Sequence, residues 1–145
     1  MPILVGGLVV TYAAVSDTAG AAEGDPSKYV AVSPHRRVDT RTGDGVKRAG
    51  DHTLRVKVAG RDGVPANASA VVVTVVATNG ASDGFVSAYP TGTERPLASI
   101  INYAPGLTYS TESIVPLGDD GSFDLYTLTD VDIVVDVTGA FVTAN

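Results

Sequence analysis

A stretch near the C-terminus, residues 131–143, constrains the fold more than any other part of the chain. It reads Val-Asp-Ile-Val-Val-Asp-Val-Thr-Gly-Ala-Phe-Val-Thr, and its many β-branched residues favour a strand. Two acids interrupt it, Asp132 and Asp136. A carboxylate buried without a partner is costly, so each acid must face water, meet a cation or take part in chemistry. The choice among these decides between an enzyme and a structural protein.

The spacing of the two acids places both on one face of a regular strand, because they are four residues apart and strand side chains alternate. Val134 lies between them on that face. The opposite face is wholly apolar and holds Ile133, Val135 and Val137. The stretch therefore predicts a strand with one buried face and one face that carries two carboxylates.

A second segment, residues 37–41, offers partners for these acids. In a regular strand, Arg37, Asp39 and Arg41 share one face. Arginine binds carboxylates strongly because it can donate two parallel hydrogen bonds. A network of Arg37 or Arg41 with Asp136 would satisfy the charges. We predict that Arg41 pairs with Asp136 or with Asp39 and closes the domain structurally; the alternative is a polar ligand pocket at the same place.

The rest of the chain has the composition and turn spacing of an all-β protein. Its 145 residues suggest one domain, large enough to bury a core without a metal or a disulfide, and it has no cysteine. The expected strands are residues 29–32, 36–41, 52–59, 69–79, 85–90, 98–103, 109–115, 122–128 and 131–143. We predict an antiparallel β-sandwich over residues 29–145, Ig-like or jelly-roll-like, of about nine strands.

The N-terminal residues, 1–28, are expected to form an apolar arm and a linker. Residues 3–15 are apolar but too short to span a membrane, and residues 16–28 are small and polar. The apolar run resembles a signal-peptide core with a cleavage site at Ala19-Gly20-Ala21, yet no Lys or Arg precedes it. The other interpretation is an extended arm that covers a sheet edge in its own subunit or a neighbour's. The predicted interface residues of that arm are Ile3, Leu4, Val5, Leu8, Val9, Val10 and Tyr12.

Several classes of chemistry lack their sequence signals. A formal net charge of −6 argues against nucleic acid and anionic membranes as partners. His35 and His52 have no metal-ligand spacing, and there is no Gly-x-Ser-x-Gly elbow. The chain has no Trp to line a carbohydrate cleft, and Asp119-Asp120 lacks the spacing of a calcium loop. We therefore expect a protein that is not an enzyme, with no catalytic residue, metal or cofactor.

Several motifs, in order along the chain, resemble a known family. They are Arg-Val-Asp-Thr-Arg-Thr-Gly (37–43), Gly-Val-Pro-Ala-Asn-Ala-Ser-Ala-Val-Val-Val-Thr-Val (63–75), Ala-Thr-Asn (77–79), Gly-Phe-Val-Ser-Ala-Tyr-Pro-Thr-Gly (84–92), Arg-Pro (95–96), Ser-Ile-Ile-Asn-Tyr (99–103), Val-Pro-Leu-Gly-Asp-Asp-Gly (115–121) and Asp-Val-Thr-Gly-Ala-Phe (136–141). Over residues 34–143 the chain resembles the β-sandwich accessory module of secreted and surface proteins of actinobacteria, also seen in virion proteins of their phages. The resemblance implies an interaction module without catalytic residues to carry over.

The chain departs from the usual setting of that module, because here it is solitary and carries an apolar arm. We therefore expect a non-enzymatic structural protein, a capsid decoration or accessory protein on the surface of a bacteriophage virion. Its arm would dock on the major capsid protein or another virion protein, and it would form a homo-oligomer, with a trimer favoured. The alternative is a secreted actinobacterial cell-surface module that binds cell-wall polymer or protein.

Overall fold

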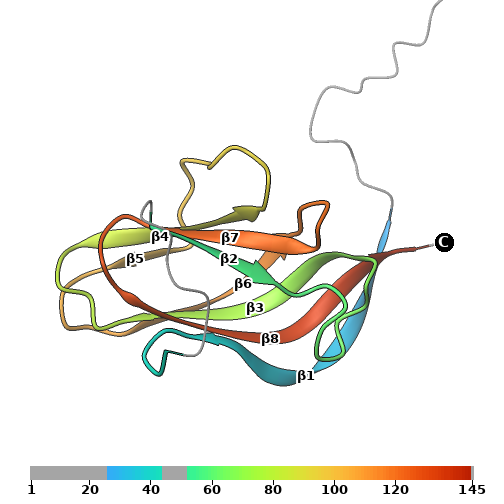
Figure 1. Cartoon of the computed structure of the whole chain (residues 1–145), viewed down its shortest axis with the longest axis horizontal. Coiled ribbons are helices and arrows are strands. Elements are labelled where there is room, and N and C mark those ends of the chain that lie inside the picture. The colour runs from blue at the N-terminus through green and yellow to red at the C-terminus, as the bar shows by residue number, and fades with distance from the viewer. Residues whose placement is uncertain (1–25, 44–51, 145) are drawn as a thin grey trace, which may run out of the picture.

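The computed structural model describes residues 26–43 and 52–144, and this part of the chain is all-β (Figure 1). Its strands are β1 (Ser27–Asp39), β2 (Thr53–Lys57), β3 (Ala68–Thr78), β4 (Gly84–Pro90), β5 (Ile101–Tyr103), β6 (Tyr109–Pro116), β7 (Ser122–Thr127) and β8 (Asp132–Thr143). They form two antiparallel four-stranded sheets, sheet A in the order β1-β8-β3-β6 and sheet B in the order β2-β7-β4-β5. The predicted all-β class and two-sheet arrangement are confirmed.

Eight strands are described where about nine were expected, because residues 29–32 and 36–41 belong to one strand, β1. The break expected between residues 32 and 36 is wrong, because β1 continues through Pro34. A proline has no N–H to donate to a neighbouring strand. It is therefore tolerated in an edge strand, where one side has no neighbour to pair with. β1 is the edge of sheet A, and its pairing with β8 skips from Ala31 to His35. The strand also begins at Ser27, two residues before the expected domain start.

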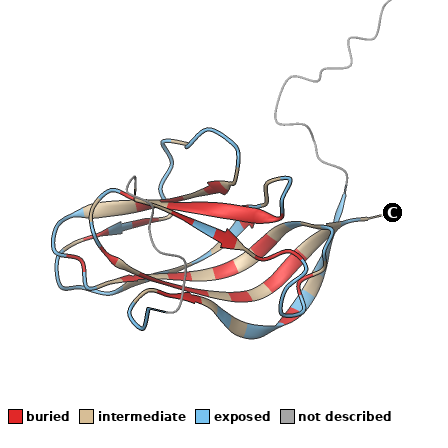
Figure 2. Cartoon of the chain, viewed as in Figure 1, coloured by how far each residue is buried: buried red, intermediate tan, exposed pale blue. Residues whose placement is uncertain are grey.

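The core lies between the two sheets, and Figure 2 shows that buried residues lie along the strands of both sheets. In β8, Ile133, Val135 and Val137 are fully buried, as the alternation of that strand predicts. β3 lies between β8 and β6 and buries Val71, Val73 and Val75 in the same way. Its outer face holds Val72 and Val76, and both are only half-buried. β3 is therefore buried on its inner face only, although it has a neighbouring strand on each side.

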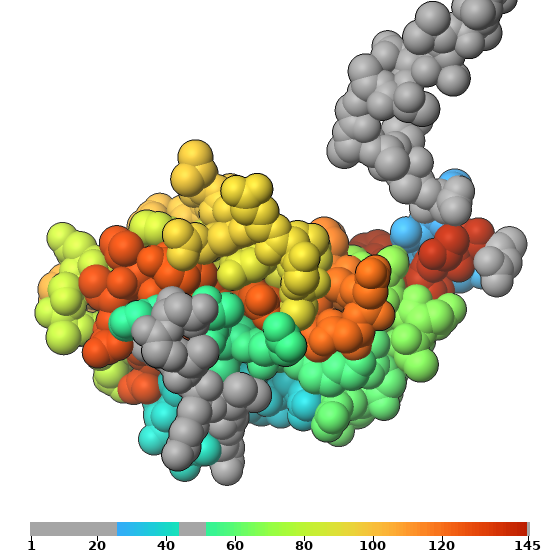
Figure 3. All heavy atoms as spheres, turned by 45° about the horizontal axis from the view of Figure 1, so that its top comes forward, coloured from blue at the N-terminus to red at the C-terminus, as the bar shows by residue number. Residues whose placement is uncertain are grey.

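The outer face of sheet B is covered by a loop of the same chain, residues 91–100 between β4 and β5 (Figures 1 and 3). The Ser87 hydroxyl in β4 donates a hydrogen bond of 2.7 Å to the carbonyl of Ala98 in this loop. The Arg95 guanidinium lies 3.8 Å from the centroid of the Tyr126 ring in β7. Ser87 is fully buried as a result, although it belongs to an outer face. Sheet B therefore carries its own cover.

Candidate functional site: the outer face of sheet A

The outer face of sheet A is divided into an apolar and a charged part by the strand register. Paired residues in neighbouring strands share a face, so the pairing defines rows that cross all four strands. Two rows are apolar: Tyr29, Phe141, Ala70 and Pro116 in one, and Ala31, Gly139, Val72 and Ile114 in the next. We call these residues the apolar patch. The following rows are Arg36, Asp136, Thr74 and Glu112, then Asp39, Val134, Val76 and Ser110, then Asp132 and Thr78.

The apolar patch exposes large side chains to solvent. Ile114 is 61% exposed and Tyr29 is 53% exposed. The Tyr29 ring lies across Gly139, where a Cβ atom would come within 2.5 Å of its Cε2 atom. The same ring meets Phe141 edge to face, with the centroids 5.6 Å apart. Gly139 thus leaves room for an aromatic pair that shapes one end of the patch.

In the charged part, one arginine of β1 and one arginine of the turn after β1 each bind a carboxylate with two hydrogen bonds. Arg36 donates from Nε to Asp136 Oδ1 at 2.8 Å and from Nη2 to Asp136 Oδ2 at 3.1 Å. Arg41 donates from Nε to Asp39 Oδ1 at 2.9 Å and from Nη2 to Asp39 Oδ2 at 2.8 Å. Arg36 Nη1 also lies 3.5 Å from Asp39 Oδ2 and links the two pairs.

These contacts change the acidity of the groups involved. The hydrogen bond from the Arg41 side chain lowers the pKa of Asp39 from 3.8 to about 2, although the partial burial of the carboxyl opposes the shift. The hydrogen bond to Asp136 raises the pKa of Arg36 above its ordinary value. Asp39 therefore stays ionised at a more acidic pH than a free aspartate does.

Arg41 pairs with Asp39, which is one of its two predicted partners. The other predicted partner, Asp136, pairs with Arg36 instead. The expected partner role of Arg37 toward Asp136 is wrong. β1 contains a bulge, because Arg36 pairs with Asp136 while Val38 pairs with Val135. The extra residue is Arg37, and it brings Arg36 rather than Arg37 onto the outer face with Asp39.

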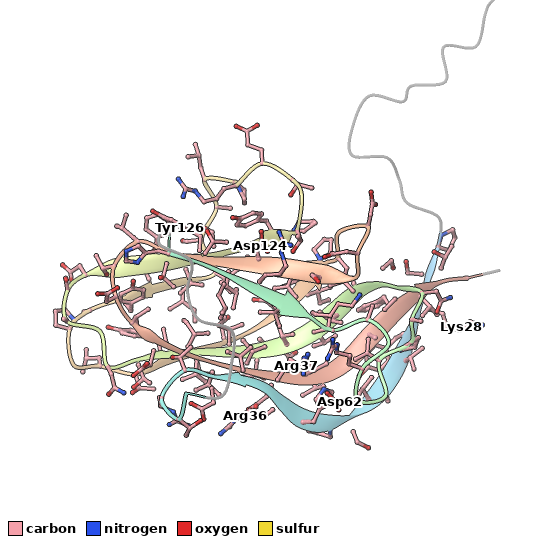
Figure 4. All side chains as sticks on the ribbon, viewed as in Figure 1. Lys28, Arg36, Arg37, Asp62, Asp124 and Tyr126 are labelled. Carbon is pink, nitrogen blue, oxygen red and sulfur yellow. The ribbon has the colours of Figure 1, made fainter. Side chains whose placement is uncertain are left out.

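Arg37 consequently points away from Asp136. Figure 4 shows that the side chains of Arg36 and Arg37 leave β1 in different directions. The Arg37 Nε donates to the carbonyl of Lys57 at 2.7 Å, and its Nη1 lies 3.8 Å from Asp62 Oδ2. Arg36 was not singled out by sequence reasoning, because a strict period of two excludes it from the face of Asp39. No local sequence signal marks the bulge.

Asp132, the first acid of β8, is held by neutral donors. The Thr40 hydroxyl donates to its Oδ1 at 2.8 Å and the Asn79 amide to its Oδ2 at 3.0 Å. The hydroxyl of Thr40 also accepts the backbone N–H of Ile133 at 2.9 Å. All three acids thus have partners. Asp132 and Asp136 link the end of β1 and the turn after it to β8, and Asp39 stabilises that turn.

The predicted arm residues, Ile3, Leu4, Val5, Leu8, Val9, Val10 and Tyr12, lie outside the described residues. Among residues 26–43 and 52–144, no three His, Asp or Glu side chains are grouped so that they could hold a metal ion. The same part of the chain contains no helix able to cross a membrane. Comparison with known proteins finds no family model that matches the sequence and no curated protein with significant similarity to it.

Proposed function

We propose that the chain is a non-enzymatic structural protein, a capsid decoration or accessory protein of a bacteriophage virion. Residues 3–15 dock it on the particle, where its partner is the major capsid protein or another virion protein. The protein is displayed on the virion surface and forms homo-oligomers, of which a trimer is the first expectation. The sandwich is of the Ig-like or jelly-roll-like kind, with an extended N-terminal arm.

The observation that carries this proposal is the place where the chain enters sheet A. β1 begins at Ser27, and Tyr29 already belongs to the apolar patch. The backbone pairing continues outward, because the N–H of Ala144 donates to the carbonyl of Pro26 at 2.8 Å. The apolar residues 3–15 are thus joined, through a short polar linker, to the end of the sheet that exposes apolar side chains.

The structural contacts of the acids support a non-enzymatic function. Asp136 and Asp39 accept paired hydrogen bonds from Arg36 and Arg41, and Asp132 accepts from Thr40. The bonds of Asp136 and Asp132 connect β1 and the turn after it to β8, and those of Asp39 hold the turn itself, so the carboxylates already have structural roles. The charged rows therefore have a structural explanation that needs no substrate.

Docking of this kind would stabilise a particle by mass action. A protein that binds only the assembled lattice favours assembly by RT ln(1 + [L]/Kd), about 2.7 kcal/mol per site at a hundredfold excess over Kd. The sandwich needs no chemistry for this effect, only a stable fold and a segment that reaches the partner.

Deletion of residues 1–20 tests the proposal. The buried core extends from Val32 to Ala140, so the shortened chain is expected to keep the β-rich circular dichroism spectrum of the full chain. It should lose association with density-banded particles and with its own copies, measured by mass spectrometry of the particles and by analytical ultracentrifugation. Association that survives the deletion would place the interface on the sandwich and contradict docking through the arm.

A secreted cell-surface module that binds cell-wall polymer or protein is the second candidate. The motifs at residues 37–43 and 136–141 favour it, because they resemble modules of secreted actinobacterial proteins. Intact mass measurement of the natural protein separates the two candidates. A mature chain that begins near Ala22 indicates secretion, and one that begins at Met1 or Pro2 supports the virion protein.

A further inference from the structure

We propose that the apolar patch on sheet A is the binding surface for residues 3–15 of a second copy of this chain. This inference rests on the proposed function and deepens it, because it names the contact that would join the copies of the proposed homo-oligomer on the particle. Copies would then be linked head to tail, the segment of each seated on sheet A of the next. A heterologous contact of this kind closes into a ring when its rotation allows.

The first argument is the contrast between the two outer faces. Sheet B covers its outer face with residues 91–100, and Tyr89 on that face is only 8% exposed. On sheet A no described residue gives equivalent cover, and Tyr29 and Ile114 remain more than half exposed. An apolar patch that crosses four strands and exposes large side chains on both edge strands is the kind of surface that a partner covers.

The second argument is chemical match. The two apolar rows contain no charged residue, and neither do residues 3–15. Four strands about 4.8 Å apart span about 14 Å, which about four or five residues of extended chain can cross. The segment of residues 3–15 is therefore long enough to traverse the patch and to place several Ile, Leu and Val side chains on it.

The third argument is the direction of the chain and identifies whose segment it is. The extended pairing of β1 with β8 continues to Pro26, so at this residue the backbone still runs in line with the strand and toward the end of sheet A. Residues 16–25 can span at most about 35 Å. A neighbouring copy beside that end is within reach without a reversal of the chain, whereas a return to the same copy requires one.

The experiment uses the full chain and two variants that each remove one side of the contact. Ile114→Lys places a charge at the β6 end of the patch, on a side chain that is more than half exposed and outside the core, so the fold is kept. Deletion of residues 1–15 removes the segment and leaves the patch. Leu97→Lys is the matched control, because Leu97 is fully exposed on the loop over sheet B.

Sedimentation velocity over a range of concentrations reports self-association. We expect the full chain and Leu97→Lys to associate alike. Ile114→Lys should weaken association at least about tenfold, as expected for a charge placed in an apolar interface. The deletion variant should be monomeric. Mixed together, the Ile114→Lys and deletion variants should form a complex of one copy each, because one supplies the segment and the other the intact patch.

Each other outcome overturns the inference. If the deletion abolishes association and Ile114→Lys does not, the arm docks elsewhere, and only the proposed function survives. If both variants associate like the full chain, the proposed function fails as well. If the full chain stays monomeric while Tyr29 and Ile114 become protected only when residues 1–15 are present, the segment occupies the patch of its own copy and the second-copy assignment is wrong. Circular dichroism of each variant confirms that the sandwich is folded.

Discussion

The outer faces of the two sheets differ in how they meet solvent. Sheet B has an outer face of aromatic and polar side chains that its own loop, residues 91–100, closes with a hydrogen bond from Ser87 and a cation–π contact at Tyr126. Sheet A has an outer face whose charged half contains two arginine–aspartate pairs and whose apolar half remains exposed. The comparison teaches that the alternation along a strand determines which residues face outward. Whether that outer face is covered by the same chain depends on the loops that connect the strands.

The largest expected effect tests the alternation along β6. Val115 is 2% exposed and points into the core, and its neighbour Ile114 points outward. Val115→Lys should destabilise the fold by about 3 kcal/mol or more, because it buries a charge without a partner. Ile114→Lys should change the free energy of unfolding by less than about 1 kcal/mol. Urea unfolding of both variants measures the difference; equal losses would show that the two faces of β6 are not distinct.

The next effect compares one tyrosine from each outer face. Tyr126 on sheet B contacts Phe85, with ring centroids 6.0 Å apart, and lies under Arg95. Tyr126→Ala should cost about 2 kcal/mol, since it removes a covered ring. Tyr29→Ala on sheet A should cost about 1 kcal/mol, because half of that ring is already in water. Thermal unfolding of the full chain checks the order, and a larger loss at Tyr29 would contradict the contrast between the faces.

A smaller effect opens the cover of sheet B. Ser87→Ala removes the donor to the Ala98 carbonyl and should cost about 1 kcal/mol. The loss should be local, with faster hydrogen exchange in residues 91–100 and unchanged exchange in β3 and β8. Uniformly faster exchange across both sheets would mean that the loop is part of the core rather than a cover.

The smallest effect is a change in pH dependence on the charged half of sheet A. The pKa of Asp39 is about 2 in the folded chain against 3.8, so this group contributes stability above pH 3.8 that is lost as the pH falls toward 2. Asp39→Asn should therefore flatten the decrease in Tm between pH 4 and pH 2. An unchanged slope would indicate that other carboxylates cause the acid sensitivity.

Most of the fold could be predicted from local patterns, because alternation and turn residues specify strands directly. The alternation in residues 131–137 located the buried Ile133, Val135 and Val137 and the outward acids of β8. It fails after Val137, because a register shift places Gly139 and Phe141 on the outer face. The break expected between residues 32 and 36 was wrong because a proline destabilises a central strand but not an edge strand such as β1. The order of strands in a sheet cannot be predicted from the residues of one strand.

The candidate site was predictable only in part, for the same physical reason. The pairing of Arg41 with Asp39 lies within three residues and follows from the segment itself. The pairing of Arg36 with Asp136 depends on a bulge at Arg37, which shifts every following side chain to the other face. The rows of the apolar patch depend on the register of four strands, which no single segment contains.

The irregular pairing of β1 also limits how many sheets can join by their edges. Pro34 and the bulge at Arg37 interrupt the ladder on one edge of sheet A, so a further strand cannot pair along it continuously. The other edge, β6, pairs with β3 without interruption over Ala70 to Ala77 and is regular. A sheet with one open edge can accept one neighbouring sheet and then offers no second edge for growth. Any association through the edges of sheet A would therefore stop at two sheets, which separates a discrete assembly from a fibre.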